Sequence, residues 1–82
     1  MNPREISERL SGKTDAVVRH LLPNGRIDGQ EWRVGSIHGE EGKSLGVRLT
    51  GDKTGVWSDF ATGESGDLLD LWVKTKGVNL SD

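Results

Sequence analysis

Glycine recurs along nearly the whole of this chain, and its spacing limits how long any helix or strand can be. Twelve of the 82 residues are glycine. Glycine adopts positive φ without a steric penalty and weakens the interior of a helix, so it marks turns and the ends of elements. The sequence therefore predicts several short elements joined by tight turns rather than a helical bundle. A chain of this length forms one domain at most, with a small core.

The chain contains no cysteine, although small domains often depend on cross-links. Neither a disulfide nor a cysteine-based structural zinc site can form. Apolar burial, a partner or a larger parent chain must therefore stabilise the fold. We expect residues 1–82 to be a single domain that opens a longer chain, because the closing VNLSD has the polar residues of a helix start.

Charge and hydropathy argue against several classes of protein. The net charge is −2, so a nucleic-acid contact would need a local basic patch rather than the overall field. The opening MNPREISERL lacks the apolar stretch of a signal peptide, and no apolar run reaches transmembrane length. We therefore expect a cytoplasmic protein with no membrane partner.

Apolar residues at helical spacing predict three helices. The first covers residues 2–10, and the second covers residues 14–22, where Pro23 prevents its continuation. The third helix covers residues 67–76 and is amphipathic. Asp67 lies at the positive end of its dipole, which favours an acidic side chain.

Between the second and third helices the apolar period changes from 3.6 to 2, which predicts strands. Strand-like alternation occurs in QEWRV at 30–34, SLGVRL at 44–49 and VWSDF at 56–60, and the polar TGDKTG at 50–55 is typical of a hairpin loop. We therefore predict an α+β fold, a small antiparallel β-meander with two N-terminal helices and one C-terminal amphipathic helix. The expected core residues are Trp32, Leu45, Val47, Phe60, Leu69 and Trp72.

Three phrases of the sequence resemble a known family. They are LLPNGR at 21–26, SLGVRL at 44–49 and WSDFATGESGDLLDLW at 57–72. They are similar to the N-terminal zinc-ribbon domain of bacterial and phage DNA primases and primase-helicases, in a cysteine-free version of that domain. The resemblance covers about residues 26–76 and implies a zinc-ribbon-like fold without zinc. The family's four zinc-ligand positions fall on Gly35, His38, Asp59 and Thr62.

The surviving ligand types do not favour a metal. Structural zinc takes four ligands, mostly thiolate or imidazole, whereas His38 and Asp59 supply two and Thr62 is a poor third. We expect no metal and no other cofactor; the alternative is a labile metal held by His38, Asp59 and Asp67. We expect Asp59 instead to accept backbone N–H hydrogen bonds from the turn at 61–63.

In the primases that this chain resembles, the ribbon domain contacts single-stranded template DNA. Such contact uses cations for phosphates and aromatic rings for base stacking. Strand alternation and the hairpin predict one platform on the outward face of the sheet, made of Arg33, Lys43, Arg48, Lys53 and Trp57. In the alternative interpretation these cations are only solvated, and Trp57 packs beneath a helix. A second basic surface would consist of Arg4, Arg9, Arg19 and Arg26.

Two functional interpretations follow. The resemblance implies a non-catalytic DNA-replication module that contacts single-stranded DNA or the primase or helicase core of a parent protein. The second interpretation is a protein-interaction or structural domain that docks through helix 67–76 and binds no nucleic acid. We expect no enzymatic activity in this domain, since its carboxylates are not accompanied by a base, a nucleophile or a phosphate loop at a meaningful spacing.

Overall fold

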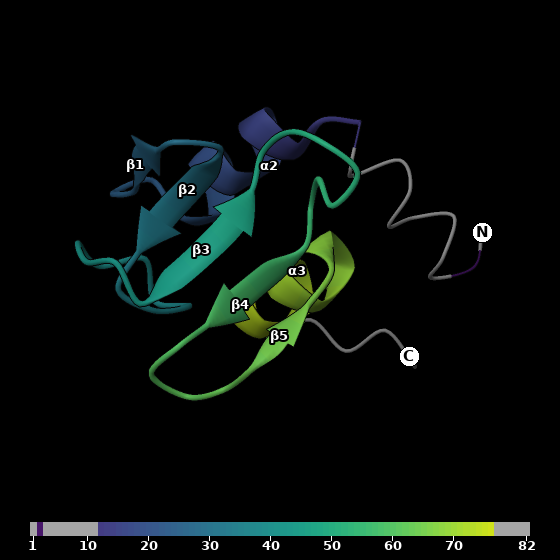
Figure 1. Ribbon diagram of the computed structural model, residues 1–82. Helices are drawn as coiled ribbons and strands as arrows, with labels where there is room; N and C mark the ends of the chain where they lie inside the picture. The colour runs from purple at the N-terminus through teal and green to yellow at the C-terminus, as the bar shows by residue number, and fades with distance from the viewer. Residues whose placement is uncertain (1, 3–11, 77–82) are drawn as a thin grey trace.

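A five-stranded antiparallel sheet forms the centre of the structure, a computed structural model that describes Asn2 and residues 12–76 (Figure 1). The strands lie side by side in chain order, so the predicted antiparallel meander is confirmed. The helix predicted at residues 2–10 lies outside the described residues, apart from Asn2. The described elements are α2 (Thr14–Leu21), β1 (Arg26–Asp28), β2 (Glu31–Val34), β3 (Leu45–Arg48), β4 (Trp57–Asp59), β5 (Ser65–Gly66) and α3 (Leu68–Lys76).

The two edge strands, β1 and β5, are not predicted by the sequence pattern. The three residues of β1 are exposed, and the strand pairs with β2 across a turn in which Gly29 has a φ of 60°. β5 has two residues, Ser65 and Gly66, and pairs with β4. Such short, mostly polar edges carry too little apolar alternation to be recognised in a sequence.

The predicted hairpin between β3 and β4 is confirmed. Gly51 and Gly55 in its loop have φ values of 88° and 90°, which other residues rarely adopt. The N–H of Gly55 donates to the carbonyl of Arg48 at 2.8 Å and so closes the loop. Residues 50–55 therefore join the same ends of two central strands.

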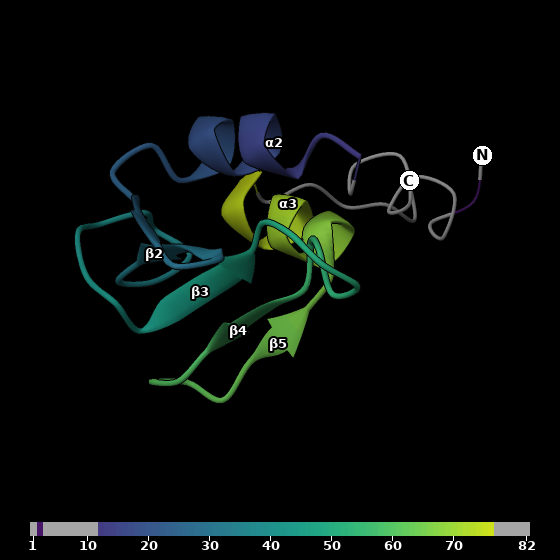
Figure 2. The same ribbon diagram turned by 45° about the horizontal axis from the view of Figure 1, so that its top comes forward.

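α2 and α3 pack on one face of the sheet, and the core lies between these helices and the sheet (Figure 2). Two buried tryptophans anchor it, and each indole N–H reaches a backbone carbonyl. Trp32 donates to Leu22 at 2.9 Å, and Trp57 donates to Asp67 at 2.8 Å. The buried cluster consists of Val17, Val18, Leu21, Leu22, Trp32, Val34, Leu45, Val47, Trp57, Leu68 and Leu71. Of the predicted core, Trp32, Leu45, Val47 and Leu69 are buried, and Trp72 is half-buried against the cluster.

Phe60 and Trp57 take the opposite places to those that the sequence predicts. Phe60, expected in the core, is 73% exposed, and Trp57, expected on the outward face, is 1% exposed. The cause is the register of β4, in which Trp57 pairs with Val47 and Asp59 pairs with Leu45. Residues 57 and 59 therefore share the inner face. Because side chains alternate along a strand, an error of one residue reverses each assignment.

α3 begins with a reciprocal pair of side-chain hydrogen bonds. The carboxylate of Asp67 accepts from the N–H of Asp70 at 2.9 Å, and that of Asp70 accepts from the N–H of Asp67 at 3.1 Å, as in a capping box. Glu64 pairs with Lys74 at 2.6 Å. This hydrogen bond lowers the pKa of Glu64 and raises the pKa of Lys74. Neither helix of the described residues has the length and apolar character to cross a membrane.

Candidate nucleic-acid interface

The sheet face opposite α2 and α3 is polar and is not covered by either helix (Figure 2). One row of directly paired residues crosses all five strands on this face. Its members, from β1 to β5, are Arg26, Arg33, Gly46, Ser58 and Ser65. The two guanidinium groups of this row therefore lie on β1 and β2, while the row carries only glycine and serine on β3–β5.

Arg33 is held by groups on three sides. Its Nη1 donates to the carbonyl of Lys43 at 3.0 Å, and its Nη2 donates to Oε1 of Glu31 at 2.6 Å. Its Nε lies 3.3 Å from the Asp28 carboxylate. Glycine at position 46 leaves room for this cluster, because a Cβ there would lie 2.9 Å from Glu31 Oε1 and 3.6 Å from Arg33 Cζ. The Glu31–Arg33 pair therefore lies over β3.

Phe60 lies beside this guanidinium, directly after the end of β4. Its ring centroid is 5.9 Å from Cζ of Arg33, which is within the range of a cation–π contact. Its backbone N–H donates to the carbonyl of Ser44 at 2.8 Å. The backbone of Phe60 is therefore fixed at the end of the β3–β4 ladder, while its phenyl ring stays in solvent. An exposed ring beside a cation is the combination that binds and stacks nucleobases.

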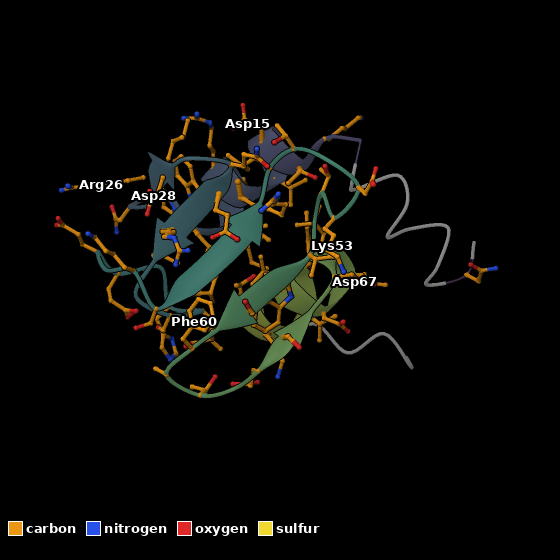
Figure 3. All side chains as sticks on the ribbon, in the orientation of Figure 1. Asp15, Arg26, Asp28, Lys53, Phe60 and Asp67 are labelled. Carbon is orange, nitrogen blue, oxygen red and sulfur yellow. The ribbon has the colours of Figure 1, made fainter. Side chains whose placement is uncertain are left out.

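Only part of the predicted platform gathers around Phe60. The backbone of Lys43 lies near it, since the carbonyl of Lys43 accepts the hydrogen bond from Arg33 and the next carbonyl, that of Ser44, accepts the N–H of Phe60. Lys53 lies in the hairpin loop, at the other end of β3 and β4, and Figure 3 labels it on the opposite side of the molecule from Phe60. Arg48 is on the outward face, as predicted, but its backbone bonds to Val56 at the hairpin end of the ladder. The five predicted residues therefore do not form one patch.

Trp57 does not belong to the surface at all. Its burial and its hydrogen bond to the Asp67 carbonyl make it a core residue, so the prediction that it lies on the outward face is wrong, and the alternative, packing beneath a helix, is confirmed. Sequence reasoning missed Phe60 as the exposed ring of this face. No signal within the strand could have found it, because VWSDF has apolar residues on both parities and the orientation depends on contacts elsewhere in the fold.

Several cations near the outward face have no acidic partner. Lys43, Arg48 and Lys53 form no ion pair within the part of the chain that the structure describes. Arg26, in contrast, pairs with Glu41 at 2.5 Å. These positive charges are therefore not neutralised by ion pairs within the described residues, although the chain as a whole carries a net charge of −2.

The second basic surface is not assembled by the described residues. Arg19 pairs with Asp15 at 2.5 Å, and its Cζ lies 4.8 Å from the Trp32 ring centroid. Its charge and its guanidinium face are thus engaged within the protein. Arg4 and Arg9 lie outside the described residues.

The four positions that align with zinc ligands lie in two loops at the same end of the sheet. Val34, Leu45 and Asp59 are neighbours across β2, β3 and β4, so the loop after β2 and the turn after β4 leave the sheet together. The first loop contains Gly35 and His38, and the turn contains Thr62 directly after Asp59, the last residue of β4. His38 is exposed, and residues 12–76 contain no group of three or more potential ligands that could hold a metal ion.

Asp59 organises the turn after β4 through hydrogen bonds. Its side chain is buried, and Oδ1 accepts the N–H of Ala61 at 2.8 Å and that of Thr62 at 3.4 Å. Its backbone carbonyl accepts the N–H of Gly63 at 2.8 Å. The prediction that Asp59 accepts backbone N–H groups from this turn is therefore confirmed. This turn is what presents Phe60 to solvent.

Comparisons of the chain with protein-family models, with curated protein sequences and with solved structures found no match.

Proposed function

We propose that this chain is a zinc-free, non-catalytic module that contacts single-stranded nucleic acid through the outward face of its sheet. The bound strand crosses the face near Phe60, with one base stacked on the phenyl ring and neighbouring phosphates close to Lys43. The sequence resemblance to primase N-terminal domains supports template DNA as the natural ligand. It also supports a primase or helicase core in the parent protein as the neighbour of the module.

The observation that carries the proposal is the exposed ring of Phe60 beside Arg33. A phenylalanine that is 73% exposed gains nothing for the core of its own domain. Its backbone is nevertheless fixed by the hydrogen bond to Ser44, and its ring lies 5.9 Å from a guanidinium that is itself held by two hydrogen bonds. The backbone that carries the ring is thus fixed before any base arrives, which limits the ordering cost of binding.

The alternative, docking through α3, has less support. The apolar residues Leu68, Leu69 and Leu71 of this helix are buried in the domain itself. The large apolar side chains that are exposed within the described residues are Ile27, Val56 and Phe60, none of which belongs to α3. On α3 the accessible apolar surface is thus limited to half-buried side chains such as Trp72.

A titration with single-stranded DNA tests the proposal. We expect a fluorescently labelled 12-mer to bind at low salt and Phe60→Ala to weaken binding by about 5- to 150-fold, because one stacked base contributes about 1–3 kcal/mol. Val56→Ala is the matched control, since it truncates a 46% exposed apolar side chain at the hairpin end of the same strand. It should bind as the wild type does.

Two results contradict the proposal. One is a wild-type protein that does not bind the 12-mer at low salt. The other is a Phe60→Ala protein that binds as tightly as the wild type. Both variants truncate exposed side chains, so we expect their circular dichroism spectra to match that of the wild type.

A further inference from the structure

A hollow of about 300 Å³ lies at the β1 edge of the sheet. It is lined by the three residues of β1, by Arg33 of β2 and by the segment 41–43. Arg33 connects it to Phe60, since this side chain lines the hollow and also lies against the phenyl ring. Figure 3 shows Arg26 and Asp28 together at the β1 edge of the sheet and Phe60 at the end of β4. Its volume is at the lower end of the range for small-molecule pockets.

Some polar side chains of the hollow are hydrogen-bonded within the protein, and others are not. Glu41 is hydrogen-bonded to Arg26 at 2.5 Å. The carboxylate of Asp28 is 64% exposed and lies 3.3 Å from Nε of Arg33, but it accepts no hydrogen bond from the residues that the structure describes. Asp28 therefore keeps its acceptor capacity. Lys43 has no acidic partner within residues 12–76.

A carboxylate that accepts no hydrogen bond and an ammonium without an acidic partner suit opposite parts of one nucleotide. A carboxylate accepts hydrogen bonds from the exocyclic amino group of a base, as Asp and Glu do with the N4 amino group of cytosine. An ammonium pairs with the phosphate. Uracil and thymine present a carbonyl oxygen at the position of that amino group, which is a second acceptor and repels a carboxylate.

We propose that this hollow is a base-reading subsite that selects a nucleotide with an exocyclic amino group and disfavours uracil and thymine. Asp28 accepts the hydrogen bond from the amino group, and Lys43 pairs with the phosphate of the same nucleotide. The adjacent base stacks on Phe60. This inference rests on the proposed function, because it assigns a base preference to the strand that the outward face binds.

The test compares two labelled 12-mers, oligo(dC) and oligo(dU), at pH 8 and low salt. Their bases differ at positions 3 and 4 of the pyrimidine ring. We expect the wild type to bind oligo(dC) at least about fivefold more tightly, which corresponds to one modest hydrogen bond to a charged acceptor. Asp28→Asn should bring the ratio close to one without weakening the binding of oligo(dU), because the variant also removes a negative charge.

Asp52→Asn is the matched control. It makes the same chemical change at an exposed position in the hairpin loop, at the other end of β3 and β4, so the preference for oligo(dC) should remain. Phe60→Ala should weaken both oligonucleotides by the same factor. Equal wild-type affinities, or a preference that survives Asp28→Asn, would overturn this inference alone. Failure to bind either oligonucleotide would overturn the proposed function as well.

Discussion

At the scale of single residues, β4 shows where a sequence pattern becomes ambiguous. In VWSDF the apolar residues Val56 and Phe60 fall on one parity and Trp57 falls on the other, so alternation by itself supports either orientation. The structure selects Trp57 because its indole N–H reaches the Asp67 carbonyl and its ring fills the space under α3. That choice depends on a helix that follows in the chain, which alternation within the strand cannot reveal.

The hydrogen bonds of Asp59, unlike the orientation of Trp57, were predictable because they form within a few residues of the chain. A carboxylate that precedes a glycine-containing turn can bond the N–H groups two and three residues later. The structure adds that this carboxylate is only 3% exposed. Hydrogen bonds within a few residues can be predicted from spacing, whereas burial depends on the rest of the fold.

Asp59→Ala should therefore destabilise the domain by about 1–3 kcal/mol, because the N–H groups of Ala61 and Thr62 lose their acceptor in a part-buried turn. Asp59→Asn keeps an acceptor oxygen and should lose less. Urea unfolding followed by tryptophan fluorescence measures both changes. Asp52→Ala removes an exposed carboxylate and is expected to stay within about 0.5 kcal/mol of the wild type; an equal loss in Asp52→Ala and Asp59→Ala would remove the special role of the buried carboxylate.

At the scale of elements, the long and strongly patterned segments were predictable and the short ones were not. The predicted helix 14–22 is confirmed as α2, and the hairpin of β3 and β4 is confirmed with its loop. Gly25, in the turn before β1, shows what the sequence leaves hidden. Gly25 does not have a positive φ. Glycine is needed there because a Cβ at this position would lie 2.1 Å from Nε1 of Trp32. The constraint is a contact with a residue seven positions later.

The Gly66-Asp67 pair has a similar explanation, and it can be tested by a double-mutant cycle. A Cβ at position 66 would lie 2.5 Å from Oδ2 of Asp70, the same oxygen that accepts the Asp67 N–H. Gly66→Ala should therefore displace the Asp70 side chain and destabilise the domain by about 0.5–1.5 kcal/mol, the net contribution of one hydrogen bond.

In an Asp70→Ala background the same Gly66→Ala change should cost less, because the hydrogen bond is already absent. The measurement is the coupling free energy from urea unfolding of the wild type, the two single variants and the double variant. Additive effects of the two substitutions would show that glycine at position 66 serves another purpose, such as the conformation of β5.

At the scale of the whole molecule, both helices cover one face of the sheet and leave the other to polar residues. The net charge of −2 conceals this division, because the acidic groups are used in ion pairs, in the cap of α3 and in the turn after β4. The overall class, α+β with an antiparallel meander, followed from the change in apolar period. The location of the candidate site did not, because it depends on which side of the sheet the helices cover.

The salt dependence of binding shows where the bound DNA strand lies on the outward face of the sheet. For single-stranded DNA, the logarithm of the association constant falls with the logarithm of salt concentration by about 0.7 for each phosphate contact. Lys43 lies beside Arg33 and the Phe60 end of the sheet, whereas Lys53 lies in the hairpin loop at the other end. Lys43→Gln should therefore reduce the slope by about 0.7 and weaken binding at low salt, while Lys53→Gln, with the same loss of one positive charge, should leave the slope unchanged.

Equal changes in both variants would mean that the DNA responds to the diffuse field of the domain rather than to a path beside Phe60. A larger change for Lys53→Gln would place the strand at the hairpin end and would separate the phosphate contacts from the exposed ring.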